Sequence, residues 1–299
     1  MSFAVPSGYR LVAYLGAGTV LDVARVVEQG ARGELVCKRV APRPGASVPA
    51  LRALRRERAV LERVVHRALP SLRAAGEDDH GPYLVETAVP GLSLAALVEG
   101  FATQAGEGAA CDGAPIPARL LAAVARASFT ALAELHALAD GEGPLGFVHG
   151  DLAPDHVLVT PSAEVGFVDL GQARLRGLGV ELFDPDPQAE RGTLPYVAPE
   201  LARGSGPPGQ GSDVYALAAT LAFAALGREP VATGEAAAQL AELAEQGVAW
   251  PAVAQALAGL GLEGLAGGLR RALAFEPAGR PSAAAVAAAL ASSTATTRR

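Results

Sequence analysis

The chain has 299 residues, of which half are hydrophobic and 19% are charged, and this composition excludes a mainly disordered or fibrous protein. The formal net charge of -6 provides no general attraction to nucleic acid or to anionic membranes, and we expect neither as a partner. The two cysteines, Cys37 and Cys111, are too few for a disulfide scaffold and fit no metal-binding spacing. The N-terminus lacks a signal-peptide pattern and no apolar run is long enough to span a membrane, so we expect a cytoplasmic protein.

The first predicted elements are strands around a glycine turn. Residues 14–26, YLGAGTVLDVARV, are typical of a β-hairpin whose turn contains Gly16 and Gly18. GELVCKRV then predicts a third strand that ends near Lys38, the single lysine among 25 basic residues. Glycine N–H groups and a compact ammonium are suited to binding phosphate, although Gly-x-Gly alone is more often a tight turn.

The following segments are predicted from their apolar spacing. In chain order they are a helix over 48–65, strands over 72–75 and 83–89, a lobe junction with a surface insertion over 91–117, a helix over 117–138 and a buried Ala-rich helix over 281–291. Glu57 lies in the first of these helices and could face Lys38. The insertion is predicted because its Gly- and Ala-rich sequence shows little periodicity.

Two acidic residues follow short apolar runs in the second half of the chain. Asp151 stands in GFVHGDLAPDHVLV and Asp169 in EVGFVDLGQAR, 18 residues later. At the ends of strands both side chains could point into one cleft. Each aspartate alone is better explained as a turn or cap residue.

Taken together, these residues resemble the eukaryotic-like Ser/Thr protein kinase family as found in bacteria, over about residues 9–290. Thr193 in GTLPY is similar to the Ser/Thr class and not to the tyrosine class. The matching motifs are the glycines Gly16 and Gly18, Lys38, Glu57, HGD at 149–151, DLG at 169–171, GTLPYVAPE at 192–200, SDVYALA with Asp213, and FEPAGRPS with Arg280.

The resemblance implies an α+β fold with two lobes and ATP held between them. The expected domain consists of a β-rich N-lobe over about 9–89 and a helical C-lobe over about 90–290. An N-terminal lead over 1–8 and a flexible tail over 291–299 complete the expected organisation.

The resemblance also implies roles for individual residues. Gly16, Gly18, Lys38 and Glu57 would bind ATP, and Asp169 would hold Mg²⁺. Asp151 would be the catalytic base. The expected structural residues are the ion pair of Glu200 with Arg280 and the helical anchor Asp213.

Several departures from the family pattern bear on catalysis. His156 stands where the family has an Asn that binds the second Mg²⁺, and imidazole is a poor ligand for this cation. Ala153 replaces a Lys that neutralises the γ-phosphate, and Leu21 replaces the third glycine. Gly150 replaces an Arg that pairs with a phosphorylated activation segment, and residues 172–192 contain no Ser, Thr or Tyr.

Three functions remain open on this basis. The departures favour a pseudokinase that binds ATP and signals to a protein partner by its conformation. An active Ser/Thr kinase acting on a protein substrate is the family default, and HGDL also suggests a small-molecule phosphotransferase similar to the aminoglycoside kinases.

Glu86 stands where the family has the residue at the back of the adenine pocket. It either competes with Glu57 for Lys38 or is an exposed strand residue.

Overall fold

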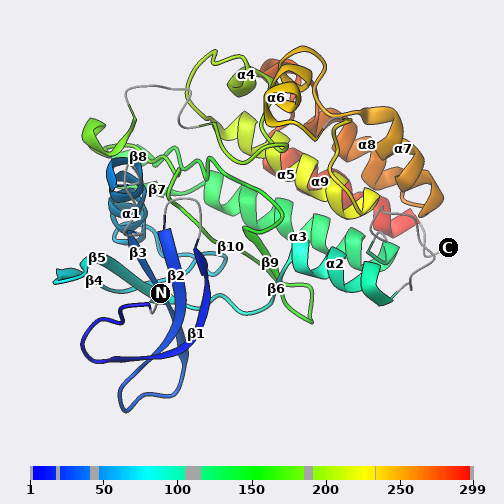
Figure 1. Cartoon of the computed structure of the whole chain (residues 1–299). Coiled ribbons are helices and arrows are strands. Elements are labelled where there is room, and N and C mark those ends of the chain that lie inside the picture. Colours follow the sequence, from blue (N-terminus) through cyan, green and yellow to red (C-terminus); the bar gives the residue numbers. More distant parts are fainter. Residues whose placement is uncertain are drawn as a thin grey trace. The chain divides into compact units, whose positions relative to one another are not determined.

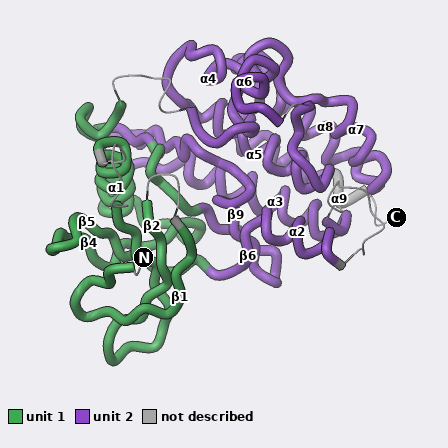
Figure 2. Tube along the Cα trace, in the orientation of Figure 1, with its two compact units in different colours: residues 1–89, 168–173, 177–185 green, residues 90–167, 174–176, 186–299 purple. Residues whose placement is uncertain are grey.

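The structure is a computed structural model that describes residues 3–17, 21–40, 47–104, 116–184, 191–232 and 234–296. The chain divides into two compact units, shown in different colours in Figure 2. Unit 1 is rich in strands and unit 2 in helices, which confirms the expected α+β class. Unit 1 comprises Met1–Val89, Val168–Ala173 and Gly177–Pro185, and unit 2 comprises Pro90–Phe167, Arg174–Arg176 and Asp186–Arg299.

Unit 1 is built on a five-stranded antiparallel sheet with the order β1-β2-β3-β5-β4 (Figure 1). The predicted hairpin and third strand are confirmed, and the predicted helix is present but ends at Leu61. Helix α1 packs against β3, β4 and β5, and the short 3-10 helix η1 packs against α1. The bounds are β1 Tyr9–Ala17, β2 Leu21–Glu28, β3 Glu34–Val40, α1 Ser47–Leu61, β4 Leu72–Asp78, β5 Gly81–Thr87 and η1 Val180–Leu182.

The pairing of β3 with β5 decides which side chains share a face of this sheet. Lys38 lies opposite Leu84, and Cys37 lies opposite Val85. Because successive residues of a strand alternate between faces, Glu86 projects from the same face as Lys38. Cys37 and Val85 are fully buried on the other face.

The N-terminal segment covers that second face. Phe3 and Val5 pack against its buried core. Arg39, itself only 4% exposed, donates a 2.6 Å hydrogen bond from Nε to the carbonyl of Ala4 and pairs with Asp78. The expected lead is therefore packed onto unit 1 from residue 3 onward.

Unit 2 consists of helices, a three-stranded sheet of order β10-β9-β6 and the small hairpin β7–β8. Its core includes α5, where Tyr215, Leu217 and Leu221 are fully buried, and α3 packs against both α5 and α9. The bounds are β6 Leu92–Ser93, α2 Leu94–Gln104, α3 Ala118–His136, β7 Ala139–Asp140, β8 Gly143–Pro144, β9 Val157–Val159, β10 Val165–Phe167, α4 Pro199–Ala202, α5 Gln210–Leu226, α6 Ala236–Glu245, α7 Trp250–Gly259, α8 Glu263–Ala272, η3 Pro277–Gly279 and α9 Ala283–Thr296.

The prediction of a surface insertion over 91–117 is wrong for its first part. Strand β6 and helix α2 occupy residues 92–104. Leu94 and Val98 lie one helical turn apart and are buried, where α2 packs against α5 and β9. These two apolar residues stand among Ala and Gly, so the helical periodicity of α2 is too weak to recognise in the sequence. Residues 105–115, which include Cys111, lie outside the described residues.

The C-terminal helix α9 differs from expectation in two ways. Among its described side chains, the buried ones are Ala283, Val286 and Leu290 on one face, whereas a buried helix was predicted. It also continues to Thr296, so the expected flexible tail is helical over most of its length. Within the described ranges, no helix combines the length and apolarity needed to cross a membrane.

Candidate functional site

Lys38 lies at the centre of a buried group of charges in unit 1. Only 7% of its side chain is exposed. Its Nζ donates a 2.6 Å hydrogen bond to Oε1 of Glu57, whose side chain on α1 is completely buried. The expected Lys38–Glu57 pair is therefore present. Because a buried charge needs a partner, this pair ties α1 to strand β3.

The same carboxylate oxygen joins α1 to residues 168–173. Oε1 of Glu57 also accepts a 3.0 Å hydrogen bond from the backbone N–H of Leu170. The preceding Asp169 has a φ of 65°, a left-handed conformation that is strained for residues other than glycine, and strain of this kind clusters at functional sites. Lys38, Glu57 and Asp169 are thus positioned within one unit.

Glu86 is buried beside Lys38, which excludes the exposed-strand interpretation. Its Oε1 lies 3.1 Å from Nζ of Lys38, and 3% of its side chain is exposed. Burial raises the pKa of Glu86 to about 8, despite the opposing effect of Lys38. Burial by itself lowers the pKa of Lys38, but the carboxylates of Glu57 and Glu86 outweigh it and raise that pKa above its ordinary value.

The glycine turn between β1 and β2 is described only in part. Gly16 has a φ of 144° in β1, and a side chain added there would meet open space. Gly18 lies outside the described residues. Leu21 begins β2 opposite Val40 and is only 6% exposed, so its side chain is packed into unit 1.

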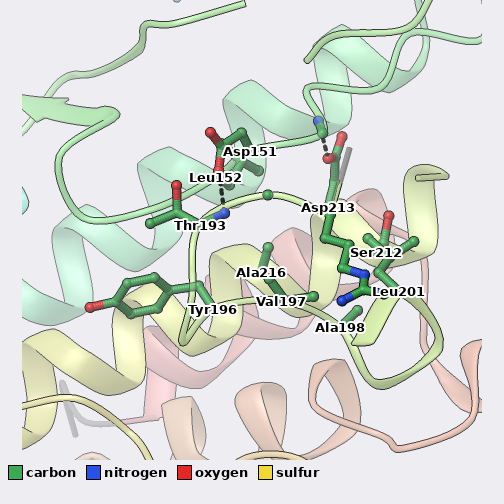
Figure 3. A pocket seen from close by; sticks show the side chains of 13 residues that line it. Asp151, Leu152, Thr193, Tyr196, Val197, Ala198, Leu201, Ser212, Asp213 and Ala216 are labelled. Atoms are coloured by element: carbon green, nitrogen blue, oxygen red, sulfur yellow. Dashed lines mark hydrogen bonds between the residues drawn. The ribbon is translucent and has the colours of Figure 1, made fainter. Parts of the chain in front are cut away.

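Asp151 is held by the backbone of unit 2. Its Oδ1 accepts a 2.7 Å hydrogen bond from the N–H of Thr193, and both residues line the pocket in Figure 3. Asp213, from the first turn of α5, accepts hydrogen bonds of 2.8 and 2.9 Å from the N–H groups of His149 and Gly150. Asp213 is 99% buried, which agrees with its expected role as anchor of the loop that carries Asp151.

His156 and Ala153 also lie in this loop. Nδ1 of His156 is 2.7 Å from the carbonyl oxygen of Asp151, so this nitrogen donates a hydrogen bond and is not a lone-pair donor to a metal. Ala153 is 1% exposed and brings no charge. The loop therefore retains the aspartate and lacks both the amide oxygen and the ammonium found in the family pattern.

The expected ion pair of Glu200 and Arg280 is present in unit 2. Nη1 and Nη2 of Arg280 each lie 2.6 Å from one carboxylate oxygen of Glu200. The guanidinium also stacks on Tyr215, 4.8 Å from the ring centroid. This bidentate arrangement joins the short helix α4 to the segment before α9.

Two arginines of α1, which the sequence motifs did not indicate, contact residues 182–184. Nε of Arg56 donates a 3.0 Å hydrogen bond to the carbonyl of Leu182, and its guanidinium lies 4.6 Å from the ring centroid of Phe183. Nη1 of Arg52 lies 2.7 Å from Oδ2 of Asp184. These contacts hold the middle of the 172–192 segment, which lacks phosphate acceptors, against α1. The only signal in the sequence is the density of arginine in α1.

The candidate metal ligands are few. In the part of the chain that the structure describes, no three His, Cys, Asp or Glu side chains form a cluster that could hold a metal ion. Mg²⁺ is commonly held by one or two carboxylates together with water and substrate phosphates. Asp169 fits that pattern as a single hard oxygen ligand.

Residues 9–287 match the protein kinase domain family, and the chain belongs to this family. The motif resemblance found in the sequence is confirmed. The match covers both units and all of the motifs on which the resemblance depends.

Two bacterial relatives are named as Ser/Thr kinases. The serine/threonine-protein kinase PknL of Mycobacterium tuberculosis is 25% identical over 241 residues, which cover 79% of this chain and 53% of PknL. The probable serine/threonine-protein kinase PkwA of Thermomonospora curvata is 30% identical over 222 residues, 74% of this chain and 26% of PkwA. The chain thus spans about half the length of PknL and a smaller share of PkwA.

A plant relative matches a shorter stretch. The probable L-type lectin-domain containing receptor kinase V.3 of Arabidopsis thaliana is 36% identical over 69 residues, 23% of this chain and 10% of that protein.

Proposed function

We propose that the chain is a Ser/Thr-type protein kinase domain that binds ATP with Mg²⁺ and transfers the γ-phosphate weakly or not at all. The observation that carries the binding part is the buried contact of Lys38 with Glu57, together with the link from Glu57 to the Asp169 segment. Signalling through a bound protein partner is the role that follows from such a domain.

The residues of unit 1 suit a nucleotide with a metal ion. Lys38 is a buried ammonium, and its Nζ supplies the cation that α- and β-phosphates need. Asp169 supplies a hard oxygen for Mg²⁺. When bound, Mg²⁺ would neutralise phosphate charge, while Glu57 keeps the Lys38 side chain oriented.

The residues of unit 2 support weak transfer. Phosphoryl transfer is catalysed mostly by positioning and by stabilising negative charge. Ala153 offers no cation, and Nδ1 of His156 is engaged with a backbone carbonyl. Loss of one cation and one metal ligand would each cost about 10²-fold or more in rate if they act as other electrostatic groups do.

An active Ser/Thr kinase is the alternative, and the geometry of Asp151 favours it. The side chain is only 10% exposed and is oriented by the Thr193 N–H, so a base for the substrate hydroxyl is retained. A phosphotransferase similar to the aminoglycoside kinases has only the HGDL motif in its support. The Glu200–Arg280 pair is a protein-kinase feature and argues against it.

Nucleotide binding is tested by the melting temperature of the protein with ADP or ATP and Mg²⁺. A ligand at about 100 times its Kd stabilises a protein by about 2.7 kcal/mol, which is readily measured. Lys38→Met should abolish the shift, and Asp169→Asn should abolish its Mg²⁺ dependence while leaving the Lys38–Glu57 pair intact. Arg25→Met, a change at a half-exposed basic residue of β2, is the matched control and should behave like the parent.

A protein whose melting temperature is unmoved by millimolar nucleotide would contradict the proposal. An equal shift in Lys38→Met would do the same. The transfer part is tested with radiolabelled ATP and a generic basic protein, using Asp151→Asn as control. Rapid transfer that depends on Asp151 would establish the active-kinase alternative in its place.

A further inference from the structure

Lys38 is shared by two buried carboxylates, although one would be enough to hold it. Oε1 of Glu57 lies 2.6 Å from Nζ, and Oε1 of Glu86 lies 3.1 Å from the same atom. The register of β3 and β5 places Glu86 on the face of Lys38, so its position follows from the sheet itself. None of the three side chains is more than 7% exposed.

The two carboxylates differ in how well they are stabilised as anions. Glu57 accepts hydrogen bonds from both Lys38 and the Leu170 N–H. Glu86 has Lys38 alone. In both glutamates Oε2 is buried without a hydrogen-bond partner among the described residues, so the difference is one donor for Glu86 against two for Glu57. Burying an anion with so few donors is costly, and the neutral acid form avoids that cost.

The charges that face Glu86 come from three elements. Lys38 of β3 favours its ionised form, whereas Glu57 of α1 and Asp169 of residues 168–173 oppose it. With both glutamates and Asp169 ionised, one ammonium is surrounded by three negative charges. A phosphate approaching Lys38 adds further negative charge to this group. Protonation of Glu86 relieves this repulsion at the lowest cost, because Glu57 and Asp169 each accept a backbone N–H as well, from Leu170 and Gly171.

We propose that Glu86 is an affinity-determining residue of the nucleotide site, which lies against Lys38 in the free protein and must be neutral when nucleotide phosphates engage that lysine. Where Glu86 is ionised, it takes up a proton from solvent on binding. This inference rests on the proposed nucleotide-binding function. The Glu86 carboxylate and the phosphates compete for one ammonium, and the new O–H bond at Glu86 ends the competition. No other bond is made or broken.

Proton uptake makes nucleotide affinity dependent on pH, with a definite sign. Glu86 has a pKa of about 8 in the free protein, so below pH 8 it is already neutral and little proton uptake is needed. Above pH 8 each binding event must protonate it. Linkage then predicts that the Kd for ADP with Mg²⁺ rises about tenfold between pH 7 and pH 9. In Glu86→Gln the Kd should be nearly constant, and at pH 9 about tenfold lower than in the parent protein.

The test is titration calorimetry of ADP with Mg²⁺ at pH 8.5, in two buffers of different ionisation enthalpy. The parent protein should take up about three quarters of a proton on binding, the fraction of Glu86 that is ionised at this pH, and Glu86→Gln should take up none. Glu77→Gln, which changes an exposed glutamate of β4, is the matched control and should retain the uptake. If Glu86→Gln does not fold, an infrared pH titration of the parent protein tests whether a buried carboxylic acid persists above pH 7.

The outcomes distinguish failure of the Glu86 inference from failure of the proposed nucleotide-binding function. Proton uptake that is lost in Glu86→Gln and kept in Glu77→Gln supports the inference. Equal uptake in the parent protein and Glu86→Gln overturns it and leaves nucleotide binding standing. An infrared titration in which all carboxyl groups ionise below pH 6 also overturns it. If ADP binds to none of the variants in calorimetry and melting experiments, the proposed function itself fails, and the inference fails with it.

Discussion

Replacing Arg280 by Ala should destabilise unit 2 by removing a completely buried cation. The guanidinium makes two 2.6 Å bonds to Glu200 and donates to the carbonyls of Ala274, Phe275 and Gly211 at 2.8 to 3.1 Å. Its side chain is 0% exposed. No side chain other than arginine offers five donors in one plane, so no substitute satisfies all of these acceptors.

The loss of folding stability in Arg280→Ala depends on the environment of Glu200 once its partner is removed. Removing one member of a buried ion pair typically costs 3 to 5 kcal/mol, because an unpaired charge remains in the interior. Glu200 retains 16% exposure and can reach water after a small shift, which favours the lower end of that range. We therefore expect about 3 kcal/mol for Arg280→Ala.

The assay is urea denaturation followed by circular dichroism at 222 nm. With a slope of about 3 kcal/mol per molar urea, the loss corresponds to a midpoint about 1 M lower. Arg270→Ala, at an exposed position of α8, is the matched control and should change the stability by less than about 0.5 kcal/mol. The double variant Glu200→Ala with Arg280→Ala should lose less than the sum of the single losses. A midpoint equal to the parent's, or strictly additive losses, would refute the reasoning.

Two further predictions concern the loop of unit 2 and the segment held by α1. His156→Asn combined with Ala153→Lys should raise γ-phosphate transfer, because an Asn amide keeps the N–H donor and adds an oxygen for Mg²⁺, while Lys restores a cation; activity no higher than the parent's, in a folded and nucleotide-binding double variant, would contradict this. Arg56→Ala should make a glutamate-specific protease cut after Glu181 several-fold faster, because the segment loses its hydrogen bonds and its stacking. Arg55→Ala, at an exposed neighbouring position, should leave the rate unchanged, and equal rates in the parent and Arg56→Ala would count against the contact.

The sequence by itself determined the family, and it predicted most residues of the candidate site. Lys38 and Asp169 stand in short motifs whose spacing is typical of protein kinases, and the match over residues 9–287 confirms that resemblance. Periodicity predicted the hairpin, α1 and α3 because alternation and helical spacing are visible within one segment. The same local reasoning failed for α2, whose two buried anchors are separated by small residues.

Only the tertiary structure decided which side chains meet. Whether Glu86 pointed toward Lys38 or toward solvent depended on the register between β3 and β5, and a shift by one residue would have reversed it. The contact of Arg56 with Leu182 joins residues 126 positions apart, and no local pattern encodes it. Burial is also a property of the folded chain, and it is burial that turns a glutamate with ordinary acidity into one with a pKa of about 8.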